Sequence, residues 1–196
     1  MGIQKKVKAV KGLFHQLDKE IDQFKSKSAL DCLKGCGSCC HKPDIEATIL
    51  EFLPLAVDLY QKGQVDEMLD LIDSNEDGRC VIFSPFLVGG STGFCSNYSQ
   101  RGLICRLFGF SATRDKNGIR NIATCKKIKE AMPELFQKAN AGVQNGDKIP
   151  GITSYYSKSQ AIDLNIGGKM YPINQAIRLA IETVALYFYY KNPRAS

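Results

Sequence analysis

The chain has 196 residues, of which 44% are hydrophobic and 23% charged, and a chain of this length and composition can bury a core without cross-links. Its 26 basic residues exceed the 20 acidic ones and give a net charge of +6. Because the basic residues are not interleaved with aromatic ones, they indicate a solvated surface and not a nucleic-acid interface. We therefore expect one domain over residues 1–196 and no nucleic-acid partner.

The N-terminal segment and the hydropathy of the chain predict a cytoplasmic protein. No apolar run with a small-residue cleavage site follows the basic residues at the start, so no signal peptide is expected. No stretch approaches the roughly 18 uncharged apolar residues of a membrane span. Cysteines stay reduced in the cytoplasm, so the eight cysteines indicate metal binding. A disulfide-stapled or thiol-redox protein is the less favoured alternative, although the even cysteine count permits it.

Apolar residues recur at alternating steps of three and four near the N-terminus and predict an amphipathic helix over residues 4–27. The apolar stripe consists of Val7, Val10, Phe14, Leu17, Ile21 and Phe24. Three heptads without clear partner-selecting charges are marginal for a coiled coil, so we expect the stripe to pack on the protein's own core. The same helix is the candidate contact for a protein partner.

A second helical pattern follows the first group of cysteines. It predicts a helix over residues 42–63, with a break or kink near Pro54 and an end at Gly63. A further short helix is expected over "VDEMLDLI", residues 65–72.

Two hairpins and further helices are predicted in the remainder of the chain. Residues 79–84 and 93–98 are rich in β-branched and aromatic side chains and predict strands of a small hairpin. A second hairpin is expected to turn at "DKNG", residues 115–118. Helical patterns return over 124–144 and 172–190. The predicted fold class is mainly α, a single helical domain with one or two small β-hairpins and cysteine-rich metal-binding loops.

The cysteines are the candidate metal ligands. Four of them occur in "CLKGCGSCC" with the spacing C-x3-C-x2-C-C, and the glycines between them let the backbone curl. Thiolates are the preferred ligands of zinc and of iron-sulfur clusters. Adjacent side chains usually diverge, so Cys39 and Cys40 are not expected to bind the same ion. The eight sulfurs suffice for two four-cysteine sites, and their partition stays open. The candidates are Cys32, Cys36, Cys39, Cys40, Cys80, Cys95, Cys105 and Cys125.

Other catalytic constellations are not evident. The chain has only two histidines, which disfavours a hydrolytic zinc site built from histidine and carboxylate ligands. His41 is either a further ligand or an exposed or capping residue. No Ser-His-Asp order, phosphate-binding loop or dinucleotide fingerprint is present.

The cysteine-rich part of the chain resembles the YkgJ-type cysteine-cluster family, which has a CxxCxxCC opening and is described as a zinc- or iron-chelating domain and as iron-sulfur-cluster-containing proteins. The residues that match its motifs are Cys36, Cys39, Cys40, Cys80, Cys95, Tyr98, Arg101, Cys105, Arg106 and Phe108. Cys32 precedes Cys36 by a longer spacing than the family's, and Cys125 follows the motif. Because a four-thiolate site carries a charge of about −2, Arg101 and Arg106 are candidate cofactor-binding residues.

Two function classes follow from this resemblance. The first is a metal-binding protein that holds an iron-sulfur cluster, or alternatively zinc, for metal handling, electron transfer or structural stabilisation. The second is an iron-sulfur-dependent enzyme of the protein-methylase or radical S-adenosylmethionine type. A flagellin lysine methylase is similar to the family, and Cys32, Cys36 and Cys39 have the C-x3-C-x2-C spacing of radical enzymes. Ser38 replaces their usual aromatic residue and no repeated strand-helix units follow, so we favour the first class.

Overall fold

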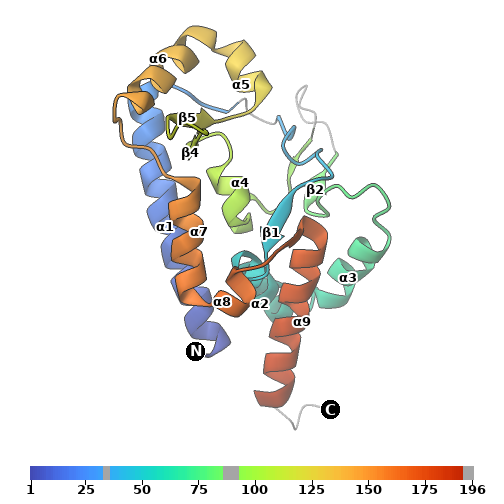
Figure 1. Ribbon diagram of the computed structural model, residues 1–196. Coiled ribbons are helices and arrows are strands. Elements are labelled where there is room, and N and C mark those ends of the chain that lie inside the picture. Colours follow the sequence, from blue (N-terminus) through green and yellow to red (C-terminus); the bar gives the residue numbers. More distant parts are fainter. Residues whose placement is uncertain (33–35, 86–92, 192–196) are drawn as a thin grey trace.

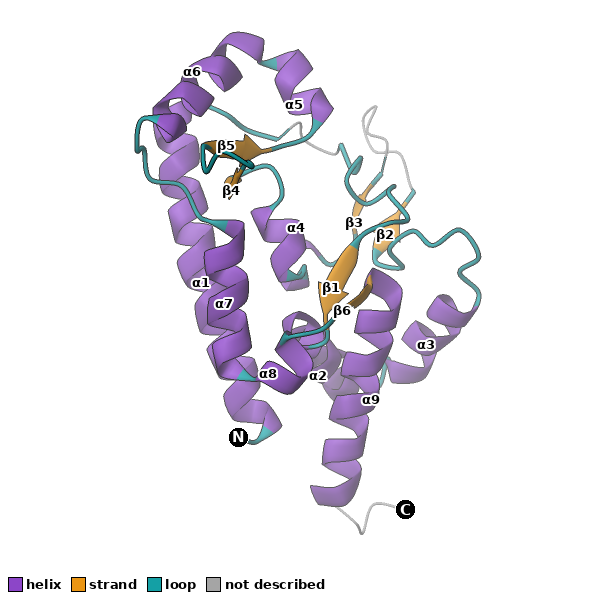
Figure 2. Cartoon of the chain, in the orientation of Figure 1, coloured by secondary structure: helices purple, strands orange, loops and turns teal. Residues whose placement is uncertain are grey.

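The structure is a computed structural model that describes residues 1–32, 36–85 and 93–191 of the chain. Most of these residues are helical, and the strands within them form three two-stranded antiparallel sheets (Figures 1 and 2). The expected mainly α fold with small hairpins is therefore confirmed. None of the helices in the described ranges is both long enough and apolar enough to cross a membrane.

Helix α1 (Ile3–Ser28) provides the longest buried stripe of the molecule. It runs beside α7 (Ile152–Ile162), as Figure 1 shows, and also contacts segments that follow the cysteine loop, residues 32–40. Its buried side chains are Ile3, Val7, Val10, Leu13, Phe14, Leu17, Ile21 and Phe24. The apolar stripe packs on the protein's own core, as expected, so a protein partner at α1 would contact the exposed polar face of the helix.

The predicted helix over residues 42–63 is wrong in its first half. That half contains strand β1 (Glu46–Thr48) and a 3₁₀ turn, η1 (Leu50–Phe52). Strand β1 pairs antiparallel with β6 (Met170–Pro172), in the register Ala47 to Tyr171. This partner is more than 120 residues away in the chain. The hydrophobic pattern of a short buried segment does not distinguish a strand from a helix, and a distant pairing partner leaves no local signal.

Helix α2 (Leu53–Lys62) forms the second half of the predicted helix. Pro54 lies in its first turn, where the missing N–H of proline has no intrahelical acceptor to lose, so it begins a helix and does not kink one. Gly63 ends α2 with a left-handed φ of 68°, as predicted. Helix α3 (Val65–Asp73) follows and agrees with the predicted short helix.

Both predicted hairpins are present. Strands β2 (Phe83–Ser84) and β3 (Phe94–Cys95) form the first, and the connection expected at "VGGSTG" lies largely outside the described residues. Strands β4 (Ser111–Arg114) and β5 (Arg120–Ala123) form the second, around the predicted "DKNG" turn. A 3₁₀ turn, η2 (Tyr98–Gln100), and the short helix α4 (Leu103–Leu107) connect the two hairpins.

The C-terminal part of the chain is helical. The predicted helix over 124–144 is divided at Pro133 into α5 (Lys126–Ala131) and α6 (Pro133–Gln144). Helix α9 (Ile173–Lys191) has the expected apolar face and packs chiefly on α2. Helices α7 and α8 (Leu164–Gly167) were not predicted. In α7 the fully buried positions are only Tyr155 and Ser159, which do not form an apolar stripe.

The buried side chains form two clusters, and α1 contributes to both. The larger cluster joins α1, α2, α4 and α9, and the smaller one lies among α5, α6 and the β4–β5 hairpin. Cys80, Cys95 and Cys105 contact the larger cluster, whereas Cys125 contacts the smaller one. Because one continuous helix joins the two cores, we propose that the chain forms a single domain, with its cysteines at the junction.

Candidate metal centre

The cysteine loop lies directly against the first hairpin. Gly37 has a left-handed φ of 55°, and the Cys40 N–H donates to the Gly37 carbonyl at 2.8 Å, which closes a tight turn. A Cβ atom on Gly37 would lie 2.6 Å from the Gly93 carbonyl oxygen and 2.9 Å from the Phe83 ring. The His41 ring also contacts Phe83 edge-on, with 4.4 Å between ring centroids. Glycine is therefore required for the contact between loop and hairpin.

The remaining cysteines come from three different local structures, and none of the eight cysteines is in a disulfide. Cys80 is buried just before β2, and its carbonyl accepts the Phe83 N–H at 2.9 Å. Cys95 lies opposite Phe83 in the β2–β3 pair. Cys105 is in the middle of α4, and Cys125 is the N-cap residue of α5. The charges of these cysteines act on one another across segments up to 93 residues apart, so they contribute to one cysteine-rich region.

One set of thiols, which we call the outer group, consists of Cys32, Cys36, Cys39 and Cys125. Partial desolvation of the sulfur and, after it, the negative charges of the other three cysteines together raise the pKa of Cys32 to about 11. The pKa of Cys36 is lowered overall, because the hydroxyl of Ser38 at 3.1 Å outweighs the effect of burial. Cys32 and Cys39 are exposed, so the outer group is open to solvent.

A second set of thiols, the inner group, consists of Cys40, Cys80, Cys95 and Cys105. Burial raises the pKa of Cys105, and the negative charges of Cys80 and Cys95 act in the same direction. The pKa of Cys40 is raised first by its hydrogen bond to Cys39 and then by burial. Since Cys80 is buried and the other three are half-buried, the inner group is enclosed by protein.

Cys39 is the member of the outer group that lies next to the inner group. The side-chain hydrogen bond from Cys40 lowers the pKa of Cys39 to about 6, and the positive charge of Arg101 acts in the same direction. The charge of Cys39 in turn acts on Cys32 in the outer group and on Cys105 in the inner group. The two groups are therefore adjacent, with Cys39 at their boundary.

Backbone N–H groups favour the thiolate form at several of the sulfurs. The Ile128 N–H donates to the Cys125 sulfur at 3.4 Å, and the backbone N–H groups of Ile82 and Phe83 oppose the effect of burial on the pKa of Cys80. Nearby backbone N–H groups also act to lower the pKa of Cys36 (from Ser38), Cys39 (from Cys40) and Cys95 (from Asn97). Hydrogen bonds to the sulfur stabilise a thiolate, which is the form that binds metal.

The positive charge of Arg101 acts on two of the cysteine thiols. Its charge lowers the pKa of Cys39 and opposes the effect of burial on Cys95. The guanidinium stacks on the Tyr98 ring at 3.9 Å from the centroid. It is thus placed to offset part of the negative charge of a thiolate site.

Arg106 is held by other partners. It is 5% exposed, and its Nη1 donates to Asp18 on α1. Its Nη2 donates to the Ser99 carbonyl at 2.7 Å, and its Nε to the Arg101 carbonyl at 3.2 Å. The side chain therefore joins the segment before α4 to α1 and supports Arg101 through the backbone.

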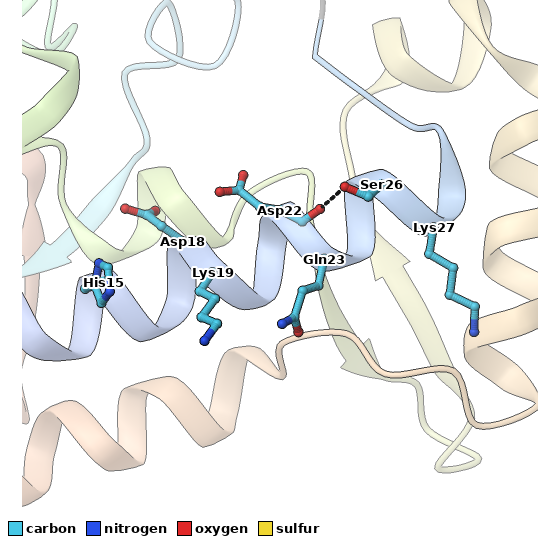
Figure 3. Close-up of a pocket in the computed structure, with 7 residues that line it drawn as sticks. All are labelled: His15, Asp18, Lys19, Asp22, Gln23, Ser26 and Lys27. Carbon is cyan, nitrogen blue, oxygen red and sulfur yellow. Dashed lines mark hydrogen bonds between the residues drawn. The ribbon is translucent and has the colours of Figure 1, made fainter.

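Asp18 also borders an open groove along α1, with a volume of about 770 Å³. Figure 3 shows that Asp18 and Asp22 project from one side of the helix, whereas Lys19 and Gln23 project from the other. The residues that line the groove are His15, Asp18, Lys19, Asp22, Gln23, Ser26 and Lys27. No cysteine lines it, so the groove is separate from the candidate metal centre.

The donor set fits a metal in type and number, because eight soft sulfur donors are gathered from four segments. In the parts of the chain that the structure describes, no three His, Cys, Asp or Glu side chains are yet arranged closely enough to hold one ion. The sulfurs would therefore have to move closer together on coordination.

Glu51 is a residue of this region that sequence analysis did not identify. It is 1% exposed, and its carboxylate accepts the Ile104 N–H at 3.0 Å, next to Cys105. Burial raises the pKa of Glu51, whereas hydrogen bonds from Thr48 and from the start of α4 oppose this effect. A single glutamate in an otherwise apolar segment has no motif that would have revealed this role.

Comparison with protein families identifies the cysteine-rich part. A family model matches residues 31–132, under the name CxxCxxCC and the description "putative zinc- or iron-chelating domain". The chain belongs to this family. The matched range contains all eight cysteines, including Cys32 and Cys125, and ends within the α5–α6 junction. No curated protein and no solved structure matches the chain.

Proposed function

We propose that this CxxCxxCC protein binds metal at two adjacent sites, one formed by the inner group and one by the outer group. The observation that carries the proposal is the gathering of eight cysteines, none of them in a disulfide, from four segments, several of them with backbone N–H groups that favour the thiolate. An all-cysteine donor set suits an iron-sulfur cluster, which we favour, and zinc is the alternative.

The partition into two groups is supported by electrostatics and by local geometry. Within the inner group the charges of Cys80 and Cys95 act on Cys105, and within the outer group the charges of Cys36 and Cys125 act on Cys32. Cys39 and Cys40 are adjacent and would belong to different sites. This assignment agrees with the tendency of neighbouring side chains to diverge.

The chain's own residues would have three effects on the bound metal. Backbone N–H donors would stabilise the thiolates, and Arg101 would offset part of their negative charge. The burial of the inner group would limit the access of water and oxidants to that site. When bound, an iron-sulfur cluster supplies one-electron redox chemistry, and zinc supplies a structural cross-link. We therefore propose metal handling, electron transfer or fold stabilisation as the role of the protein.

The second candidate function is a radical S-adenosylmethionine or protein-methylase type of enzyme. It is favoured by the exposure of Cys32 and Cys39, which with Cys36 have the three-cysteine spacing of such enzymes. In this case the outer group would use three cysteines and Cys125 would not be a ligand. The sheets within the described residues are all two-stranded, which does not support the partial barrel of those enzymes. We therefore place this function second.

The eight cysteines outside disulfides also motivate a cytoplasmic location, since a reducing compartment preserves thiols. A protein partner, if it uses α1, would contact the exposed residues along the groove in Figure 3. Fluorescence localisation of the tagged chain and crosslinking from Lys19 test these two proposals. Secretion of the chain would contradict the first, and the absence of a crosslinked partner in its native cells would contradict the second.

The deciding experiment is metal analysis of protein purified without oxygen. Iron, zinc and acid-labile sulfide are measured for the wild type, for Cys105→Ser in the inner group and for Cys125→Ser in the outer group. Ser26→Ala, an exposed substitution on α1, is the control. Two sites are supported if each cysteine variant loses only part of the metal. Loss of all metal in both variants would indicate one shared site, and a folded wild-type protein without metal would refute the proposal.

If Cys125→Ser retains its full metal content, the three-cysteine alternative gains support. Reductive cleavage of S-adenosylmethionine by the reconstituted protein would then decide in favour of the enzyme. Absence of cleavage in protein with full iron content would leave the metal-binding function.

A further inference from the structure

The buried carboxylate of Glu51 connects two segments on either side of the inner group. Its Oε1 accepts the Thr48 N–H at 2.6 Å and the Thr48 hydroxyl at 3.0 Å. Its Oε2 accepts the Ile104 N–H at 3.0 Å. Through these bonds one side chain joins β1 and η1 to the beginning of α4, which is 53 residues further along the chain.

The chain around α4 is adapted to this carboxylate. Gly102 immediately precedes α4, and a Cβ atom there would lie only 2.7 Å from Glu51 Oε2 and 2.9 Å from the Phe52 ring. Real Cβ atoms essentially never approach that closely. The absence of a side chain at Gly102 therefore makes room for the hydrogen bond between Glu51 and Ile104.

Burying a carboxylate is costly unless it is fully hydrogen-bonded. Glu51 is 1% exposed, whereas the nearby Glu46 on β1 is exposed. Three donors point at Glu51, and each of them favours the ionised form. These hydrogen bonds hold the carboxyl group at a fixed position in the core and oppose the effect of burial, which raises its pKa overall.

This carboxyl group lies close to a candidate ligand. Cys105 follows Ile104 directly in α4, and the charge of Glu51 acts on the Cys105 thiol. It also acts on Tyr156 of α7, whose hydroxyl is buried and has no hydrogen-bond partner among the described residues. A hydrogen bond that holds α4 by its first turn also limits where the sulfur of Cys105 can lie.

We propose that Glu51 is a positioning residue of the metal centre: it fixes α4 so that Cys105 faces the other inner-group cysteines. This inference rests on the proposed function. Replacing a residue that orients a metal ligand typically lowers metal affinity by about 10- to 100-fold.

The test compares four variants. Glu51→Gln keeps the shape but turns one accepting oxygen into an N–H₂ donor and removes the charge. Gly102→Ala keeps the carboxylate but displaces it. Thr48→Val removes only the hydroxyl donor, and Glu46→Gln removes an exposed charge as the matched control. Zn²⁺ affinity is measured by competition with a chromophoric chelator on the metal-free full chain, together with the thermal midpoint.

We expect Glu51→Gln and Gly102→Ala each to weaken Zn²⁺ binding at the inner site by about tenfold or more. Thr48→Val should weaken it by only a few fold, and Glu46→Gln should leave it unchanged. In a Cys105→Ser background the effect of Glu51→Gln on affinity should disappear, since the two residues would act through the same ligand. A merely structural role would lower the thermal midpoint but would leave the effect on affinity the same in both backgrounds.

A folded Glu51→Gln protein with wild-type affinity would overturn the inference, as would an equal effect of this substitution in the Cys105→Ser background. If Glu51→Gln does not fold, Gly102→Ala and Thr48→Val decide on the same criteria. A wild-type chain that binds no Zn²⁺ refutes the proposed function instead.

Alkylation distinguishes a chain that does not bind metal from one in which Glu51 does not position Cys105. In metal-free protein, iodoacetamide labelling followed by mass spectrometry reports the accessibility of Cys105 relative to Cys80. We expect labelling of Cys105 to be faster in Glu51→Gln than in the wild type and unchanged in Glu46→Gln. Equal rates in the wild type and Glu51→Gln would show that Glu51 does not position Cys105, whether or not metal binds.

Discussion

Replacing Gly37 with alanine should lower the metal affinity of the candidate centre by much more than the backbone strain alone would. Gly37 has a φ of 55°, and a non-glycine residue in this conformation costs about 1–2 kcal/mol. The added Cβ would also lie 2.6 Å from the Gly93 carbonyl oxygen, whereas ordinary contacts begin near 3.4 Å. The cysteine loop would therefore have to move by about 0.8 Å away from the first hairpin.

That movement is large compared with the tolerance of a metal site. Metal–ligand distances in a well-formed site stay within about 0.2 Å of their preferred values. Gly37 lies between Cys36 of the outer group and Cys40 of the inner group, so both sites would be distorted. We expect Gly37→Ala to lower metal affinity at least about tenfold, comparable to the loss of a residue that orients a ligand.

Gly63→Ala is the matched control for this experiment. Gly63 has a φ of 68°, and a Cβ added to it would meet nothing within 4 Å. It should therefore lose about 1 kcal/mol of stability but keep its metal affinity. Urea denaturation and Zn²⁺ competition are measured on both variants. The reasoning is refuted if Gly37→Ala binds metal as tightly as Gly63→Ala does.

Three further predictions concern protons, charge and metal removal. Metal affinity should rise with pH, because burial raises the pKa of Cys80 to about 11, so that this neutral thiol must release a proton on binding. The hydrogen bond between Cys39 and Cys40 lowers the pKa of one thiol and raises that of the other, so this pair should release fewer than two protons at pH 8. Calorimetry in buffers of different ionisation enthalpy counts these protons, and an affinity that falls with pH between 6 and 8 would contradict the sign. Asp18→Asn should destabilise the fold by about 1–3 kcal/mol, because the buried Arg106 loses a charged acceptor, whereas the exposed Asp22→Asn should be neutral in urea denaturation. Equal midpoints for these two variants would argue against this ion pair. Removal of metal by a chelator should lower the thermal midpoint of the holoprotein, and an unchanged midpoint after verified removal would mean that the metal does not stabilise the fold.

Much of the fold could be predicted from local patterns. The apolar stripe of α1 has a strong 3.6-residue period, and the ends of α2 and of the second hairpin are marked by glycines whose conformations other residues rarely adopt. Strand β1 could not be predicted, because its pairing partner β6 lies at the other end of the chain. Helix α7 was missed because its buried positions do not form an apolar stripe.

The candidate site shows the same division. The spacing of the cysteines and the motif around them were sufficient to identify the family, because thiol chemistry and short-range spacing are both local properties of the sequence. The inner and outer groups could not be distinguished, because Cys40, Cys80 and Cys105 become neighbours only after α4 and the first hairpin pack together.

The amino-acid sequence alone was sufficient for the helical class, the hairpin positions and the cysteine chemistry, because these depend on residue type, periodicity and spacing over a few residues. Tertiary structure alone decided that Arg106 pairs with Asp18 and that Glu51 is buried against the first turn of α4. Such contacts join residues that are far apart in the chain, and they form because packing removes a charged group from water and leaves it one set of partners.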